Sequence, residues 1–293
     1  MGKYIVVTGG AGFVGSNLIN YFLKKTKYRV ISIDDYSSGT KKNHIINRRI
    51  HYIKGKTKNI SKILEKKKKN INAIFHFGEF ARIYQSFLKM SQCLESNSVG
   101  SHAVFNFCLT NNIKLIYSAT SASLGNKGKD ENLSPYAFTK SKNLELLDNL
   151  KKWFKMKYEV IYFYNVYGPN QICKGDMATV IGIFEEHYKK KKPLPIVKPG
   201  TQSRKFTHIS DTIKICFEAW RKNKCRHYSI SSKKNFTIIE VAQLFKSKIK
   251  YLPPRKGERY ASALASLNLS NKVYKKFGNT SLKKYVKNFI EEK

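Results

Sequence analysis

Hydrophobic and polar positions near the start of the chain follow the pattern of a strand, a tight turn and a helix. Tyr4–Val7 is a β-branched and aromatic run that leads directly into Thr8-Gly9-Gly10-Ala11-Gly12-Phe13-Val14-Gly15. The amphipathic pattern over Ser16–Lys24 predicts a helix, and Arg29–Ile33 predicts a second strand. These segments together make one βαβ unit of about 30 residues.

The same alternation continues along the chain and predicts an α/β fold. Further strands are predicted over Ala73–Phe77, Lys114–Tyr117 and Val160–Tyr164, and helices over Ser96–Leu109 and Ser141–Phe154. Alternating strands and helices are typical of a Rossmann fold, a doubly wound parallel sheet. After Pro169 the loops lengthen and prolines become frequent, which predicts a second, smaller lobe. We expect a Rossmann domain over 1–168 and a C-terminal substrate lobe over 169–293, with about 204–231 returning to the first domain.

The sequence argues against a membrane-spanning protein and against a metal-binding protein. The 293 residues contain no stretch approaching the roughly 18 consecutive apolar residues of a membrane helix. We therefore predict a cytoplasmic protein with no membrane partner. The five cysteines form no CxxC pair and do not cluster with histidine, so we predict no metal site.

The charge is strongly positive, with 56 Lys and Arg against 19 Asp and Glu. The lysines are spread over the whole chain, and aromatic residues are not interleaved with them as a nucleic-acid surface would need. We interpret the excess as a solvated surface and do not expect nucleic acid as a partner. A positive field can still steer a phosphate-bearing ligand towards a cleft.

The glycine-rich turn predicts a dinucleotide site. It satisfies GxGxxG through Gly10, Gly12 and Gly15, and it stands between a strand and a helix, where free N–H groups can hold a pyrophosphate. Asp34, at the end of the second strand, can accept both ribose hydroxyls and repel a 2′-phosphate, which favours NAD. Lys41 lies nearby and leaves NADP open as an alternative.

A second pattern, Tyr136-Ala137-Phe138-Thr139-Lys140, predicts acid–base chemistry. Residues four apart on a helix share a face, so Lys140 can lie beside the phenol of Tyr136 and favour its phenolate. A free tyrosine has a pKa of about 10 and is otherwise a poor base at neutral pH. The serine-rich turn after Lys114–Tyr117 can place a hydroxyl on the reacting oxygen.

These motifs resemble the extended short-chain dehydrogenases that epimerise or dehydrate nucleotide sugars, and among them the UDP-glucose 4-epimerases. The resemblance covers almost the whole chain and rests on TGGAGFVGSNL, IDDYSSG, YSATSASLG, SPYAFTK, FYNVYGPNQ, TQSRKFTHISD and PPRKGE. It implies an NAD-dependent enzyme that acts on a nucleotide-diphosphate sugar, and a homodimer.

The resemblance also implies the residues of the site. The catalytic residues would be Tyr136, Lys140 and Thr120. Cofactor contacts would come from Gly9, Gly12, Phe13, Val14, Gly15, Asp34, Asp35, Ser38, Gly39, Phe77, Gly78, Asn97, Ser118, Tyr136 and Lys140. Substrate contacts would come from Thr120, Asn165, Arg204, Arg255 and Glu258.

Two departures from the family pattern bear on the site. Gly55-Lys56-Thr57 replaces a Gly-Asp pair that contacts adenine, which leaves that contact open. Gly78-Glu79 replaces two alanines, so a carboxylate stands near the cofactor or the substrate, where Glu79 either bonds a sugar hydroxyl or points away.

The residues after Thr120 bear on the choice of reaction. The family's dehydratases carry Asp-Glu there, and its decarboxylases carry a glutamate at the second place, but this chain has Ser121-Ala122. Epimerisation at C4 through a 4-keto sugar needs neither. We therefore predict a 4-epimerase. A reductase or dehydrogenase using NAD or NADP, or a dehydratase, is the alternative, followed by a noncatalytic NAD-binding scaffold.

Overall fold

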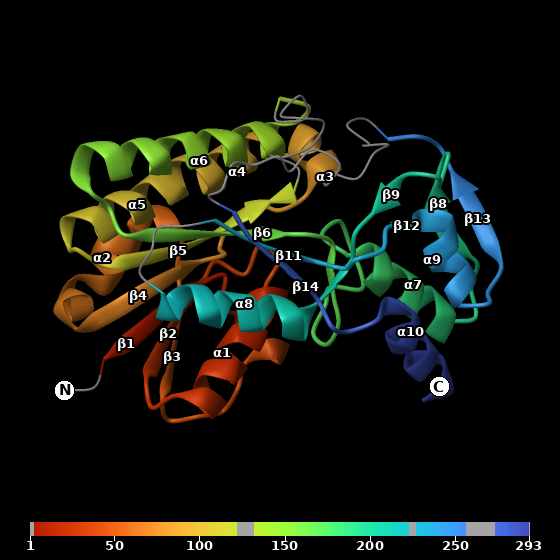
Figure 1. Ribbon diagram of the computed structural model, residues 1–293, viewed down its shortest axis with the longest axis horizontal. Helices are drawn as coiled ribbons and strands as arrows, with labels where there is room; N and C mark the ends of the chain where they lie inside the picture. The colour runs from red at the N-terminus through yellow and green to blue at the C-terminus, as the bar shows by residue number, and fades with distance from the viewer. Residues whose placement is uncertain (1–2, 122–131, 223–226, 256–272, 293) are drawn as a thin grey trace.

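The computed structural model describes residues 3–121, 132–222, 227–255 and 273–292, and a parallel eight-stranded sheet forms their centre (Figure 1). The strand order is β14-β11-β6-β5-β4-β1-β2-β3, which confirms the predicted doubly wound fold. The strands are β1 (Tyr4–Thr8), β2 (Arg29–Asp34), β3 (Ile50–Lys54), β4 (Ile71–His76), β5 (Lys114–Thr120), β6 (Tyr158–Phe163), β11 (His227–Ser231) and β14 (Val273–Phe277).

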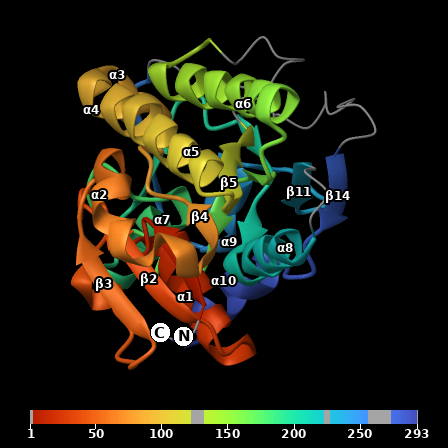
Figure 2. The same cartoon turned by 90° about the vertical axis from the view of Figure 1, so that its left-hand side faces the viewer.

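Helices cover both faces of this sheet (Figure 2). Alternate residues of β1 point to opposite faces: Ile5 and Val7 pack in one core cluster and Val6 in the other. The first cluster joins the sheet to α1 (Phe13–Lys25) and α8 (Ile209–Arg221), and the second to α2 (Ile60–Leu64), α5 (Ser101–Thr110) and α6 (Pro135–Phe154). Burial of these two clusters stabilises the three-layer arrangement.

The order of the strands reverses beside β1. The chain runs from β1 outwards to β2 and β3, and then crosses back to add β4 on the other side of β1. The loops that follow β1 and β4 therefore diverge at the carboxyl edge of the sheet, where a doubly wound fold leaves its ligand crevice.

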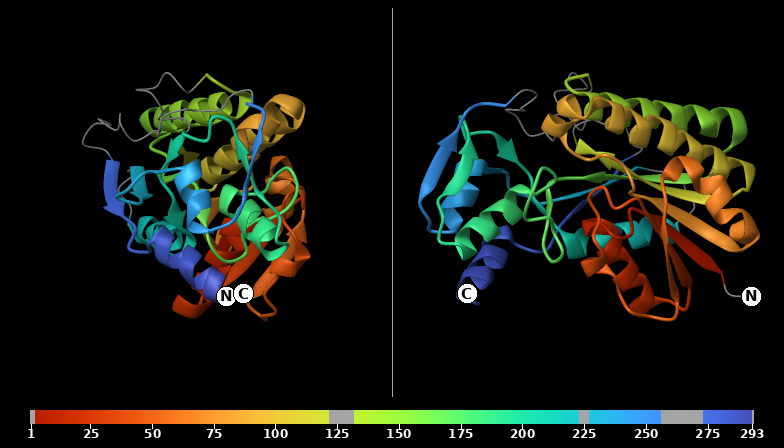
Figure 3. Two further views of the ribbon diagram at one scale, coloured as in Figure 1. Left: turned by 90° about the vertical axis from the view of Figure 1, so that its right-hand side faces the viewer. Right: turned by 180° about the vertical axis from the view of Figure 1, so that it is seen from behind.

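A smaller lobe stands beyond that edge of the sheet (Figure 3). Its core joins Tyr167, Phe184 and Phe245 with residues of the C-terminal helix. Its elements are β7 (Val166–Tyr167), α7 (Val180–Lys189), β8 (Leu194–Val197), β9 (Ser203–Arg204), β10 (Thr207–His208), β12 (Phe236–Thr237), α9 (Ile238–Leu244), β13 (Ile249–Leu252) and α10 (Leu282–Glu291). Between them the chain returns to the large sheet through α8 and β11, and again through β14, which the pattern did not predict.

Two helices differ from the predicted ranges. α6 begins at Pro135 instead of Ser141, because Ser134 accepts a hydrogen bond from the Ala137 N–H at 3.1 Å and caps the helix. The predicted helix over Ser96–Leu109 consists of a π-helical turn over Glu95–Gly100 followed by α5. Among the described residues, no helix is both long and apolar enough to cross a membrane.

Burial of α1 against the sheet gives a stability prediction. Ile19 on α1 is fully buried, whereas Ile46 is fully exposed. We expect Ile19→Ala to lower the free energy of unfolding by about 2–5 kcal/mol, because it leaves a cavity in the core. The matched change Ile46→Ala should alter it by less than about 0.5 kcal/mol. Urea denaturation measures both, and equal effects would contradict this packing.

Candidate active site

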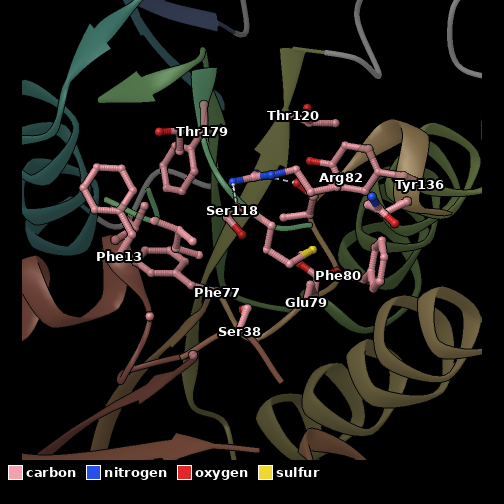
Figure 4. A pocket seen from close by; sticks show the side chains of 18 of the residues that line it. Phe13, Ser38, Phe77, Glu79, Phe80, Arg82, Ser118, Thr120, Tyr136 and Thr179 are labelled. Atoms are coloured by element: carbon pink, nitrogen blue, oxygen red, sulfur yellow. Dashed lines mark hydrogen bonds between the residues drawn. The ribbon is translucent and has the colours of Figure 1, made fainter. Parts of the chain in front are cut away.

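A cavity of about 950 Å³ lies between the carboxyl edge of the large sheet and the smaller lobe (Figure 4). Most of the predicted site residues line it: Gly9, Gly12, Phe13, Val14, Gly15, Asp34, Asp35, Ser38, Phe77, Gly78, Ser118, Thr120, Tyr136, Lys140, Asn165, Arg204 and Arg255. Gly39 and Asn97 are not in this lining, and Glu258 lies outside the described residues.

The glycine turn is a point of close backbone approach. Gly9 has a φ of +70°, and a Cβ on it would lie 2.8 Å from the amide nitrogen of Gly78. A Cβ on Gly15 would lie 2.2 Å from the carbonyl oxygen of Gly9. Side chains at these positions would push apart the turn, the start of α1 and the loop after β4.

This turn fits the diphosphate of a dinucleotide. α1 begins at Phe13 with no side-chain cap from Gly12, and residues 12–15 line the cavity. The N-terminus of the helix therefore offers N–H donors and the positive end of its dipole at the cavity wall.

Asp34 is fixed at the edge of the same cavity. Its side chain accepts hydrogen bonds from the backbone N–H of Ala11 at 2.9 Å and of Tyr36 at 2.8 Å. Burial raises the pKa of the Asp34 carboxyl, and these two backbone hydrogen bonds oppose that rise. Gly39 packs directly on this side chain, since a Cβ there would lie 2.8 Å from an Asp34 oxygen. A side chain at Gly39 would therefore displace the Asp34 carboxylate.

Two lysines line the cavity where the family's adenine contact is replaced. Lys56 and Lys58 both pair with Glu95, at 3.0 and 2.7 Å. Their ion pairs hold the turn after β3 against the π-helical turn. Lys41, by contrast, is not in the cavity lining.

Tyr136 lies in the first turn of α6, and its half-buried side chain lines the cavity. Burial raises the pKa of Tyr136 to about 12; a hydrogen bond with Thr120 lowers it, the charge of Glu79 raises it, and the charge of Arg82 lowers it. Thr120 ends β5, and the two side chains occupy the same side of the cavity, opposite Phe13 and Phe77 (Figure 4). The sheet and the helix therefore bring the predicted base and hydroxyl together.

Lys140 lines the same cavity as Tyr136, and its ammonium is paired with a carboxylate that the sequence pattern did not assign to it. Its ammonium forms a buried ion pair with Glu79 and donates to the carbonyl oxygen of Ser118 at 2.5 Å. The side chain of Glu79 is 2% exposed, so it points inwards to Lys140 and not out to a sugar. The positive charge of Lys140 is thus already balanced, which agrees with the high pKa of Tyr136.

Sequence reasoning placed the Glu79 carboxylate near the cofactor or the substrate but did not predict its ion pair with Lys140. It missed Arg82, for which the sequence carries no signal. Arg82 donates to the carbonyl oxygens of Ala81 and Met177 and so ties the loop after β4 to the smaller lobe.

Asn97 lies outside the cavity lining and holds neighbouring segments together. It is fully buried; its amide accepts from the Phe80 N–H at 2.7 Å and donates to the Phe80 carbonyl at 3.0 Å and to Thr139 at 3.2 Å. These bonds explain its position: Asn97 fixes the loop after β4 against α6, and the cavity lining is formed by its neighbours.

Three of the predicted substrate residues also line this cavity. Asn165 has a φ of +33°, and its amide donates to the carbonyl oxygen of Lys205 at 3.0 Å. Arg204 donates to the carbonyl oxygen of Ser203 at 2.9 Å, and the Arg255 guanidinium lies 5.5 Å from the ring centre of Tyr84. Two guanidinium groups in the lining of one cavity suit a diphosphate. No cluster of potential metal ligands occurs within the described ranges.

Comparisons with known proteins agree with this geometry. The chain is 32% identical over 229 residues to the uncharacterized UDP-glucose epimerase YtcB of Bacillus subtilis, which covers 72% of this chain and 70% of the relative. It is 27% identical over 273 residues to a putative UDP-glucose 4-epimerase of Methanocaldococcus jannaschii, covering 87% and 88% of the two chains.

Two solved structures share the whole fold. The UDP-glucose 4-epimerase of Thermotoga maritima, solved with UDP-glucose, superposes with a TM-score of 0.86 at 24% identity, over 99% of this chain and 98% of the other. The UDP-N-acetylglucosamine 4-epimerase of Methanobrevibacter ruminantium, solved with UDP-N-acetylmuramic acid, gives 0.83 at 27% identity, over 100% and 99%. The model of the NAD dependent epimerase/dehydratase family matches residues 5–231. The chain therefore belongs to the NAD-dependent epimerase/dehydratase family, and its cofactor is NAD.

Proposed function

We propose that this protein interconverts the C4 epimers of a nucleotide-diphosphate sugar through a transient 4-keto sugar. The observation that carries the proposal is the hydrogen bond between Tyr136 and Thr120, in a cavity that also contains the glycine turn. One group that can take a hydroxyl proton and one that can hold the same oxygen stand together beside the dinucleotide site.

The chemistry divides between the cofactor and these side chains. NAD, when bound, would supply the hydride acceptor and donor, and its positive nicotinamide ring would favour the phenolate form of Tyr136. As the phenolate, Tyr136 removes the proton of the C4 hydroxyl and later gives it back, and Thr120 donates a hydrogen bond to the same oxygen.

The substrate side of the cavity supports a nucleotide sugar. Arg204 and Arg255 can hold the diphosphate while the keto sugar turns its other face to the cofactor. The relatives named above are UDP-glucose and UDP-N-acetylglucosamine epimerases, so we infer that the nucleotide is UDP. Ser121-Ala122 lacks the Asp-Glu pair of the dehydratases, which favours epimerisation over elimination. The predictions that the protein forms a homodimer and is located in the cytoplasm stay untested.

The activity test uses the purified protein without added cofactor. We expect it to release NAD on denaturation and to interconvert UDP-glucose with UDP-galactose, or their N-acetyl counterparts. Tyr136→Phe should lower kcat by about 10²–10⁴-fold, because it removes the acid–base group. The control Tyr162→Phe removes a buried hydroxyl outside the cavity, where it bonds His227 at 2.8 Å, and should keep kcat within about threefold. Absence of bound NAD, with net reduction only when NAD(P)H is supplied, would favour the reductase instead.

The fixed carboxylate of Asp34 gives a prediction about cofactor affinity. Asp34→Asn puts an amide NH₂ against one of the two backbone N–H groups that now bond the side chain. We expect the Kd for NAD to rise at least about tenfold, or roughly 1.4 kcal/mol. Glu65→Gln is the control, because Glu65 is exposed, pairs with Lys68 at 2.6 Å and is not in the cavity lining. Calorimetric titration of cofactor-stripped protein compares the two variants, and an equal or larger effect at Glu65 would refute the assignment.

A further inference from the structure

Glu79 stands at the centre of a buried polar network. One carboxylate oxygen accepts hydrogen bonds from Ser101 at 2.8 Å, from Tyr117 at 3.0 Å and from Asn143 at 3.4 Å. The other oxygen is paired with the ammonium of Lys140. Both oxygens are therefore satisfied, as a buried carboxylate requires.

The network is fixed from the sheet side by His76. Its ring nitrogens lie 2.8 Å from the Thr8 hydroxyl and 2.9 Å from the Ser101 hydroxyl. Burial lowers the pKa of His76 to about 4, so the ring is neutral at physiological pH. Neutral His76 contacts Ser101, which in turn donates to Glu79. Within the described residues, Lys140 is the cation that forms an ion pair with Glu79.

The charges around Tyr136 come from every element packed against it. Lys140 lies on its own helix, Glu79 follows β4, Arg82 precedes α3 (Ile83–Leu88), and Cys93 lies on α4 (Met90–Leu94). Burial raises the pKa of the Cys93 thiol to about 11, so it is uncharged at neutral pH. The carboxylate of Glu79 is thus the negative charge that opposes formation of a Tyr136 phenolate.

We propose that Glu79 is a positioning residue: its carboxylate holds the Lys140 ammonium against the Ser118 carbonyl and balances the positive charge that would otherwise act on the Tyr136 phenol. A carboxylate at this place has two opposite effects. It fixes the lysine in a buried site, and it cancels the positive charge that the tyrosine would otherwise use. The inference rests on the proposed function only in taking Tyr136 as the base.

The first test needs no turnover. The near-ultraviolet absorbance of tyrosinate is followed against pH in the NAD-bound protein, and the same titration of Tyr136→Phe is subtracted to isolate Tyr136. The titration is repeated with the single variant Glu79→Gln. The titration of the double variant that carries both Glu79→Gln and Tyr136→Phe is then subtracted from it. We expect the midpoint for Tyr136 to fall by about one pH unit in Glu79→Gln, because Lys140 then has no other anion to balance it. An unchanged or raised midpoint would overturn the proposal.

Two further variants separate charge from position. Glu79→Asp keeps the charge and withdraws the carboxylate, so the midpoint should stay within about half a unit while kcat falls at least about tenfold. Full activity in Glu79→Asp would refute the positioning role, even if Glu79→Gln fails to fold. Glu218→Gln removes a carboxylate that pairs with Lys222 and Lys276 outside the cavity, and it should change neither readout. Should the wild type itself lack epimerase activity, the proposed function fails while the titration still decides the effect of Glu79 on Tyr136.

Discussion

The close approach of backbone at Gly9, Gly15 and Gly78 is the constraint on which the site depends. The strand order reverses beside β1, so the turn after β1 and the loop after β4 leave the sheet side by side. A Cβ on any of these three glycines would lie under 3.0 Å from backbone of the neighbouring segment. Because these three residues have no Cβ, the first turn of α1 can reach the cavity. The diphosphate site depends on that position of the helix.

The acid–base residues lie at the same carboxyl edge of the sheet. β4 ends just before Glu79, and β5 ends at Thr120, so both reach α6 where Tyr136 and Lys140 occupy its first turns. Asn97 ties the loop after β4 to this helix. The geometry of the base is therefore built on two adjacent parallel strands and one capped helix, with the smaller lobe closing the cavity from the other side.

The sequence predicted those parts of the fold whose determinants are local. The βαβ unit, the glycine turn and the cavity position of Asp34 could be found because strand, turn and helix patterns are adjacent in the chain. β3 and β14 could not, since neither shows a clear alternating pattern: β3 is a half-exposed edge strand, and β14 pairs with β11 from far along the chain. The start of α6 was missed, although Ser134-Pro135 is a capping sequence.

In the site, sequence patterns predicted which side chains gather but not how their charges pair. The spacing of Tyr136 and Lys140 places both on one helix face, and it contains no information about Glu79, which lies 61 residues away from Lys140 and binds it. Such a contact depends on the loop after β4 lying beside α6. Asn97 likewise needed the structure, because its partners belong to the loop after β4 and to α6.

In the proposed reaction, the hydrogen at C4 leaves the sugar as hydride and returns to it within one cavity. A UDP-sugar carrying deuterium at C4 tests this step when it is incubated with the protein in ordinary water and the product is analysed by mass spectrometry and proton NMR. We expect a product with an inverted C4 centre that keeps its deuterium. Loss of the label to water, or its transfer to free NAD(P) without inversion, would rule out the proposed epimerisation.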